Sequence, residues 1–203
     1  AAKRAGGLLI CDEVQSGFGR CGSHFWAYQK QGVLPDVVCL GKPMGNGHPV
    51  AGVVTTRDII DRFRTAFRYF NTFGGNPVSV AAATAVLDEL EENNLQAHAA
   101  QIGALAAERL RDLATKYEVI GDVRQSGMVF GAEFVTNRDT KDPASDFTDH
   151  VVNAMRHRGV ILSKLGRHKN TLKIRPPMPF GEDHLDLLIE TLDAVLSDLS
   201  GAA

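Results

Sequence analysis

Short runs of consecutive apolar residues alternate with polar, glycine-rich segments in the first third of the chain. Such runs are typical of strands that are covered on both faces of a parallel sheet. They predict three buried strands, over 8–11, 37–40 and 50–55. A short helix is expected over 24–31 and a longer one over 57–68. The pattern therefore favours an α/β region at the start of the chain.

The rest of the chain has helical spacing first and paired strands afterwards. Asn76 followed by Pro77 predicts a helix start, because asparagine caps helices and proline suits the first helical position. Helices are predicted over 78–92, 94–117, 147–157 and 182–199, with Asn94 as a second cap. Strands are predicted over 119–124, 128–135, 160–163 and 171–174, the first two as an antiparallel pair. This order indicates a small α+β domain, so we place a boundary at Asn93–Asn94, between domains 1–93 and 94–203.

Composition narrows the class of protein. The 203 residues are 44% apolar and 23% charged, with a net charge of −2. These values are ordinary for a globular protein, and no nucleic acid or membrane is expected as a partner. The three cysteines lack metal-ligand spacing, so we expect no metal site and reduced thiols in a cytoplasmic protein. The chain starts without methionine, shortly before its first candidate site residue, and we expect a fragment that lacks its front part.

A lysine and an aspartate each follow one of the predicted strands. Asp12 ends the first strand, and Lys42 follows the second one in a glycine-rich turn. Ligands in open α/β sheets bind beyond the carboxyl ends of the strands, so both side chains can reach one ligand. The pair suits pyridoxal 5'-phosphate (PLP), because a lysine forms a Schiff base with its aldehyde and an aspartate keeps its ring nitrogen protonated. Taken singly, Asp12 is more simply a loop cap and Lys42 a solvated lysine.

Other phosphate-binding motifs fit less well. The segment Gly17–Gly22 matches G-x-G-x-x-G, but a dinucleotide site should follow its strand directly and open a helix. Lys42 is not a Walker lysine, because Pro43 follows it in place of serine or threonine. The segment Thr72–Asn76 is most simply a turn before a helix, although a hydroxyl beside backbone N–H groups can also bind phosphate.

Four segments taken together resemble the class III PLP-dependent aminotransferases. They are DEVQSGFGR (12–20), GKPMGNGHP (41–49), FNTFGGNP (70–77) and LKIRPPM (172–178). The resemblance implies PLP-dependent fold type I, with part of a mostly parallel large-domain sheet followed by a small C-terminal α+β domain. It also implies a homodimer with shared active sites. The most similar branch contains alanine–glyoxylate-type aminotransferases and ethanolamine-phosphate and phosphohydroxylysine phospho-lyases.

The resemblance also implies roles for individual residues at the cofactor. Asp12 would pair with the pyridine nitrogen, and Gln15 would contact the phenolic oxygen of the ring. Lys42 would be the Schiff-base lysine and would then act as general base and acid at the substrate carbon. Thr72 would reach into the neighbouring subunit's site and bind the cofactor phosphate.

Substrate binding is predicted near the end of the chain. Many class III aminotransferases have an arginine at the position of Lys173 that binds the substrate carboxylate. A lysine cannot grip a carboxylate bidentately, but Arg175 lies two residues further on. Residues two apart on a strand share a face, so the two side chains can form one anion site. The alternative is that both are solvated residues at a sheet edge.

Three functions stay open at this point. The first is transfer of an amino group from an amine or amino acid to a keto acid. The second is a phospho-lyase, in which the same carbanion chemistry expels phosphate from a phosphorylated amino alcohol. The third is a non-catalytic fragment that only dimerises, because the resemblance covers roughly the C-terminal half of a family enzyme. The phosphate cup and the ring-stacking aromatic residue of the family's front half would lie outside this sequence.

Overall fold

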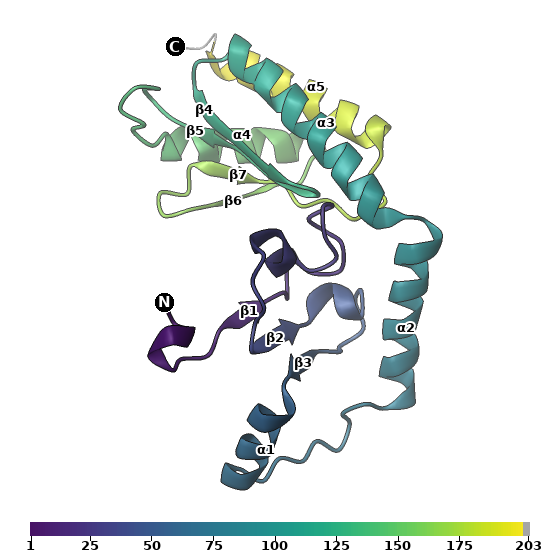
Figure 1. Cartoon of the computed structure of the whole chain (residues 1–203). Coiled ribbons are helices and arrows are strands. Elements are labelled where there is room, and N and C mark those ends of the chain that lie inside the picture. Colours follow the sequence, from purple (N-terminus) through teal and green to yellow (C-terminus); the bar gives the residue numbers. More distant parts are fainter. Residues whose placement is uncertain (201–203) are drawn as a thin grey trace. The chain divides into compact units, whose positions relative to one another are not determined.

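The computed structural model describes residues 1–200 and divides into two compact units (Figure 1). The first unit comprises Ala1–Ala97, and the second begins at His98. The predicted boundary at Asn93–Asn94 lies in the turn between α2 (Pro77–Glu92) and α3 (Leu95–Lys116). The division by contacts falls inside α3, so this one helix contributes residues to both units.

The first unit is built on a three-stranded sheet. Strand β1 (Ile10–Asp12) pairs in parallel with β2 (Val37–Leu40), and β2 pairs in antiparallel fashion with β3 (Gly52–Thr55). Backbone N–H groups of Leu9 and Asp36 fix the parallel register, since Leu9 donates to Asp36 Oδ2 at 2.7 Å and Asp36 donates to the Leu9 carbonyl at 2.8 Å. All three predicted strands form, and β1 and β3 each begin two residues later than predicted.

The prediction that these strands are buried on both faces is wrong. Consecutive strand residues point to opposite faces, yet Val53 and Val54 expose 65% and 58% of their surface. Ile10 is 60% exposed, and among the residues of the three strands only Val38 is buried. Apolar runs of this kind are buried where helices cover both faces of a sheet. The helices in residues 1–97 leave much of both faces open.

Short helices and one aromatic cluster complete the sheet region. The predicted helix over 24–31 is wrong in extent, because only a 3₁₀ helix, η2 (Ala27–Gln31), forms there. The residues before it pack their rings instead, with Trp26 edge-on to Phe18 and Phe25 at centroid distances of 5.1 and 4.7 Å. The remaining helices here are η1 (Lys3–Ala5), η3 (Lys42–Met44) and α1 (Arg57–Ala66), which is two residues shorter than predicted.

The two predicted helix caps differ in outcome. Asn76 caps α2 as predicted, since its side chain accepts a hydrogen bond from the Ser79 N–H at 3.0 Å, and Pro77 is the first helical residue. Asn94 does not cap α3 in this way. Its φ of 49° is left-handed, whereas an N-cap residue is extended. The Asn94 N–H donates to the Glu91 carbonyl and so closes the turn that follows α2.

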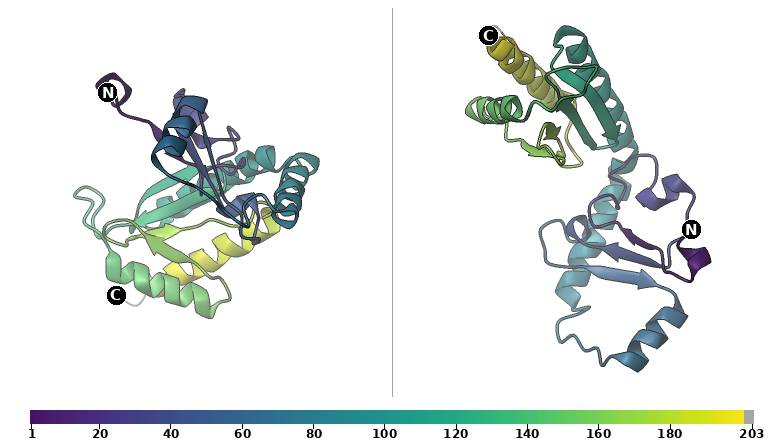
Figure 2. Two further views of the ribbon diagram at one scale, coloured as in Figure 1. Left: turned by 90° about the horizontal axis from the view of Figure 1, so that it is seen from below. Right: turned by 90° about the vertical axis from the view of Figure 1, so that its left-hand side faces the viewer.

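The second unit is a two-layer α+β domain, as predicted (Figure 2). Its antiparallel sheet has the order β4-β5-β7-β6. The strands are β4 (Ile120–Ser126), β5 (Val129–Phe134), β6 (Ser163–Leu165) and β7 (Thr171–Lys173). Alternate residues of β5, namely Phe130, Ala132 and Phe134, are buried against α3, α4 (Ser145–His157) and α5 (Glu182–Ser200). The three helices therefore cover one face of the sheet.

Strand β6 begins three residues later than predicted. Val160 and Leu162 pack against the core from an irregular segment, and Ile161 between them is 86% exposed. The alternation of partly buried and exposed residues has the period of a strand, although this segment does not pair with another strand. This explains why the strand was predicted to start at residue 160. None of the helices within residues 1–200 is long and apolar enough to cross a membrane.

Candidate active site

The parallel pairing of β1 and β2 brings the predicted aspartate and lysine to one edge of the sheet. Asp12 is the last residue of β1 and is in register with Cys39 of β2. Lys42 follows the end of β2 after Gly41. Since the two strands run in the same direction, their carboxyl ends meet at the same edge. Asp12 Oδ1 also accepts the Val14 N–H at 3.0 Å, so Asp12 caps its own loop as well.

Lys42 begins a tight turn in a strained conformation. Its φ is 40°, in the left-handed region that few residues other than glycine adopt. Backbone bonds close the turn, including one from the His48 N–H to the Gly45 carbonyl at 3.0 Å. A Cβ on Gly45 would lie 2.2 Å from the His48 carbonyl oxygen, so the turn requires glycine there. Strain of this kind clusters at functional sites, and here it presents an exposed lysine at the sheet edge.

Lys42 and Gln15 line a common hollow of about 490 Å³. Arg20 and His48 also contribute to its wall, together with Asn46 and other residues of the turn. Asp12 lies at the same sheet edge but is not among the lining residues. Of the predicted cofactor residues in the first unit, Lys42 and Gln15 line the same hollow, whereas Asp12 and Thr72 do not.

Glu13 is a buried residue that the sequence did not single out. It is 2% exposed, and its carboxylate accepts three hydrogen bonds. Oε1 accepts the Tyr28 N–H at 2.8 Å, and Oε2 accepts the Ala27 N–H at 3.0 Å and the Ser16 hydroxyl at 2.9 Å. The pair Asp12-Glu13 gives no sequence signal for which carboxylate points inward, since that depends on strand pairing.

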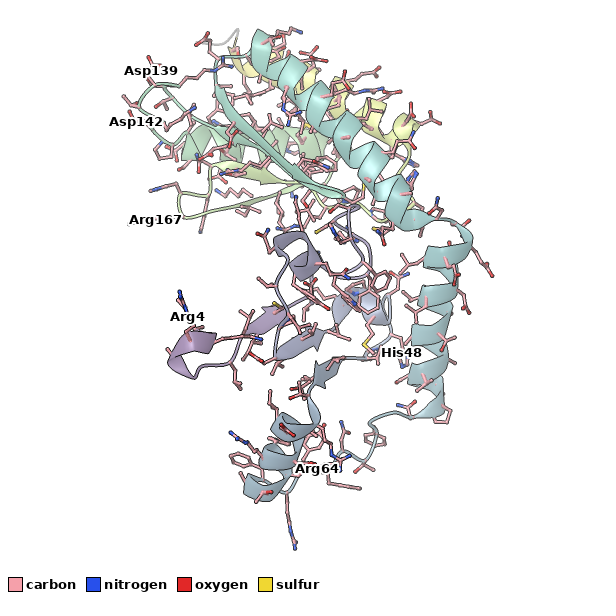
Figure 3. The ribbon with its side chains drawn as sticks, in the orientation of Figure 1. Arg4, His48, Arg64, Asp139, Asp142 and Arg167 are labelled. Carbon is pink, nitrogen blue, oxygen red and sulfur yellow. The ribbon has the colours of Figure 1, made fainter. Side chains whose placement is uncertain are left out.

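His48 connects the Lys42 turn to helix α2. Its Nε2 lies 2.9 Å from the hydroxyl of Ser79, which also accepts a hydrogen bond from Asn76 Nδ2 at 2.9 Å. Figure 3 shows His48 beside α2. Ser79 is buried in the first turn of this helix, directly after the loop that carries Thr72. A histidine and a serine 31 residues apart give no sequence signal of this contact.

Thr72 lies outside the Lys42 hollow of its own chain. It is exposed in the segment between α1 and α2. Four aromatic side chains of this segment are also largely exposed: Phe67 (63%), Tyr69 (70%), Phe70 (87%) and Phe73 (79%).

Lys173 and Arg175 share the open face of the second unit's sheet, as their spacing predicts. They line a hollow of about 510 Å³ together with Arg124, Glu133 and Arg167. Arg124 is paired, since its Nη2 lies 2.8 Å from Glu133 Oε2. Arg175 Nε is buried and has no hydrogen-bond partner in the described part of the chain. Figure 3 shows Arg167 at the connection between β6 and β7.

Two glycines of the Gly17–Gly22 segment, Gly17 and Gly19, have packing roles. A Cβ on Gly17 would lie 2.8 Å from the Trp26 ring, and one on Gly19 would lie 3.0 Å from Gln96 Cβ. The segment opens no helix of its own before η2. The close approach of side chains therefore explains the glycines at positions 17 and 19.

Comparison with known proteins decides the family. The family model described as aminotransferase class III matches residues 1–196. The chain belongs to this family. An alanine–glyoxylate aminotransferase 2-like protein of Drosophila melanogaster is 45% identical over an alignment that covers 100% of this chain and 42% of the relative. The chain thus spans less than half the length of this relative.

Solved structures of the family share the fold. An Arthrobacter phospholyase in complex with phosphoethanolamine has a TM-score of 0.92 and 46% identity over 96% of this chain and 46% of its own. A PLP-bound amine transaminase from an uncultivated Pseudomonas species has a TM-score of 0.86 and 31% identity over 97% of this chain and 46% of its own. The class III family is thereby PLP-dependent and of mixed α/β fold, which confirms the fold and the cofactor that the sequence predicts.

The residues of the first unit fit this cofactor chemically. A primary amine and a carboxylate stand at the ends of neighbouring parallel strands, and an amide side chain lines the hollow beside the amine. PLP needs an amine for its aldehyde and an anion for its pyridine nitrogen. Lys42, Asp12 and Gln15 are therefore the residues of this chain that could hold it.

Proposed function

We propose that the protein is a PLP-dependent aminotransferase that moves an amino group from an amine or amino acid to a keto acid. The observation that carries the proposal is that the strained Lys42 turn and Asp12 lie at the same edge of a parallel strand pair. The bound cofactor would supply an electron sink for negative charge that develops at the substrate carbon. In this proposal the cofactor-binding residues Asp12, Gln15, Lys42 and Thr72 all lie within domain 1–93.

Each residue at the sheet edge has a defined task in this proposal. Lys42 would hold the cofactor covalently and would move a proton at the substrate carbon. Asp12 would stabilise the proton on the pyridine nitrogen, because a carboxylate beside a pyridinium favours the charged form of both. Gln15 would contact the phenolic oxygen of the ring. Thr72 would bind the cofactor phosphate of a second copy through its hydroxyl.

A homodimer is part of the proposal. The exposed aromatic side chains around Thr72 support it, because apolar surface of this extent on a soluble protein marks an interaction site. We assign a second copy as the partner, so that the Thr72 segment of each chain completes the other chain's site. Cytoplasmic location belongs to the same proposal, and three free cysteines support a reducing environment.

Lys173 and Arg175 are proposed to bind the anionic group of the substrate. The support is the buried, unpartnered Nε of Arg175 on a face where Arg124 is already neutralised by Glu133. Buried polar groups are normally hydrogen-bonded, so this nitrogen suits an acceptor that arrives with the substrate.

A phospho-lyase acting on a phosphorylated amino alcohol is the second candidate. The cationic hollow around Arg167, Lys173 and Arg175 favours it, because several separate cations suit a phosphate dianion. Phosphoethanolamine offered without a keto acid separates the two reactions. Release of inorganic phosphate supports the lyase, whereas a strict need for a keto acid supports the aminotransferase. A chain that dimerises without either reaction would be the third candidate, a non-catalytic fragment.

Reductive trapping tests the cofactor site on the chain itself. PLP followed by borohydride should leave a pyridoxyl group on Lys42, located by peptide mass spectrometry. Lys169, which is exposed in the other unit, serves as the reference within the same sample. Lys42→Ala should remove the main adduct, and Lys169→Ala should leave it unchanged. Equal labelling of Lys42 and Lys169 would contradict the assigned site.

A further inference from the structure

Glu13 is a buried acid with no task in the proposed reaction. Every polar group of this residue is engaged. Its N–H donates to the Cys39 carbonyl at 3.0 Å, and its carbonyl accepts the Gly17 N–H at 3.1 Å. Its carboxylate accepts the bonds from Ser16, Ala27 and Tyr28. Burying a carboxylate is costly unless hydrogen bonds replace its water, and here both oxygens have such partners.

We propose that Glu13 is a positioning residue of the Lys42 site, whose carboxylate ties Ser16 to the start of η2 and so holds Gln15 at the wall of the Lys42 hollow. Gln15 lies between the two residues that this bond joins. The bonds to Ala27 and Tyr28 anchor the same carboxylate to a segment 14 and 15 residues further along the chain. The inference deepens the proposed function, since it explains how Gln15 is kept in place.

The direction of the side chain shows that Glu13 acts through its neighbours. Glu13 continues the extended backbone of β1 by one residue, since its N–H bonds to β2. Consecutive extended residues point to opposite faces, so the exposed Asp12 and the buried Glu13 face apart. Glu13 also does not line the Lys42 hollow. Burial, and then the nearby Glu13 carboxylate, raise the pKa of the neighbouring Cys11 thiol.

The single tryptophan of the chain gives a direct readout without cofactor. Trp26 precedes the first residue of η2, and its ring packs on Phe18, Phe25 and Gly17. Glu13→Gln keeps the shape but places an amide N–H where an acceptor is required. We expect the Trp26 emission of this variant to move to longer wavelength. Asp58→Asn, which removes an exposed acid of α1 in the same unit, should leave the emission unchanged.

A double-mutant cycle separates positioning from general support of the fold. At limiting PLP, Glu13→Gln should lower borohydride trapping at Lys42, relative to Lys169, by about fivefold or more. Gln15→Ala should lower it too. The double variant should be no worse than the poorer single variant, because Glu13 acts through Gln15. Ser16→Ala is a second variant for the case in which Glu13→Gln folds poorly. It removes one hydrogen bond and leaves the buried carboxylate in place, so it should lower trapping at Lys42 by a smaller factor.

The outcomes that overturn the inference are equally concrete. Parental emission and parental trapping in Glu13→Gln would show that the carboxylate positions nothing, and fully multiplicative losses would show that it acts independently of Gln15. Absence of selective Lys42 trapping in the parent chain would refute the proposed function instead. In that case the Trp26 emission alone tests the proposed role of Glu13. A shift with unchanged far-ultraviolet circular dichroism supports the role of Glu13 in holding this segment, and no shift overturns it.

Discussion

Lys42 has a backbone conformation that costs an L-residue roughly 1–2 kcal/mol. The turn that follows offsets this cost with its own backbone bonds, among them Met44 N–H to the Gly41 carbonyl at 3.0 Å. A lysine in this state is aimed by its backbone before any ligand arrives. The position of the Lys42 side chain therefore depends on how tightly the turn can close.

Gly45 tests this dependence. Gly45→Ala should distort the turn, because its Cβ would meet the His48 carbonyl oxygen and, at 2.5 Å, Val50 Cγ1. We expect pyridoxyl trapping at Lys42 to fall about tenfold and the free energy of unfolding by about 1–3 kcal/mol. Gly52→Ala is the matched control, since its Cβ would only touch Met44 at an ordinary 3.6 Å. Equal behaviour of the two variants, in trapping and urea unfolding, would rule out the tight closure as the cause.

At the scale of elements, the contact between His48 and Ser79 joins the turn that follows η3 to the first turn of α2. Asn76 accepts the Ser79 N–H and donates to the Ser79 hydroxyl, so the amide orientation is fixed by two bonds. His48→Ala and Ser79→Ala should each destabilise the first unit, with a coupling of about 1 kcal/mol in a double-mutant cycle measured by urea unfolding. Strict additivity would mean that the two side chains do not interact in solution.

Helices α3 and α5 are joined by a charged cluster with a pH dependence. Hydrogen bonds from Lys116 and then Tyr117 hold the pKa of Asp193 below its usual range, and Asp193 in turn raises the pKa of Lys116. A depressed carboxyl pKa stabilises the fold above the unfolded-state value near 3.9, and this stability is lost as the pH falls through the folded-state pKa. The raised pKa of Lys116 also stabilises the fold. This stabilisation is fully present below about pH 10.4 and is lost as the pH rises through the folded-state pKa.

Asp193→Asn tests how much this cluster stabilises the fold and how that stabilisation depends on pH. Its unfolding free energy should lie below that of the parent at neutral pH, and the gap should close as the pH falls below about 4. Denaturant titrations at several pH values measure this. Glu190→Gln, an exposed acid on the same helix, is the control and should track the parent throughout. A gap that stays constant between pH 3 and pH 7 would assign the loss to packing.

Elements with local signals were predictable, and those with distant causes were not. The start of α2 was predictable because the capping asparagine, Asn76, and the first helical residue, Pro77, are adjacent in the sequence. The structure has the same cap. The sequence predicts too long a helix at η2, because it does not show that the Trp26 ring packs on Phe18, eight positions away. The inward turn of Glu13 was missed for a similar reason, since its partners lie at the start of η2. Spacing identifies faces of a strand, but only the partners decide which face is buried.

For the whole molecule, the proposed homodimer rests on the Thr72 segment. Phe70→Ser removes its most exposed aromatic ring and should shift the protein from dimer towards monomer, as measured by sedimentation velocity. Ile161→Ser removes a similarly exposed apolar side chain in the second unit, and it should leave the oligomeric state unchanged. A purely monomeric parent chain, or equal effects of both changes, would refute this interface.

The sharing of α3 between the two units has a consequence for folding. Helix formation is cooperative, because each added residue extends an existing nucleus. Its first residues, up to Ala97, belong to the first unit, in which Gly19 packs closely on Gln96. Once the remainder of α3 is ordered in the second unit, those residues only need to extend it. Heating should therefore melt the chain in one transition rather than two, since neither unit can lose its share of the helix without fraying the other's.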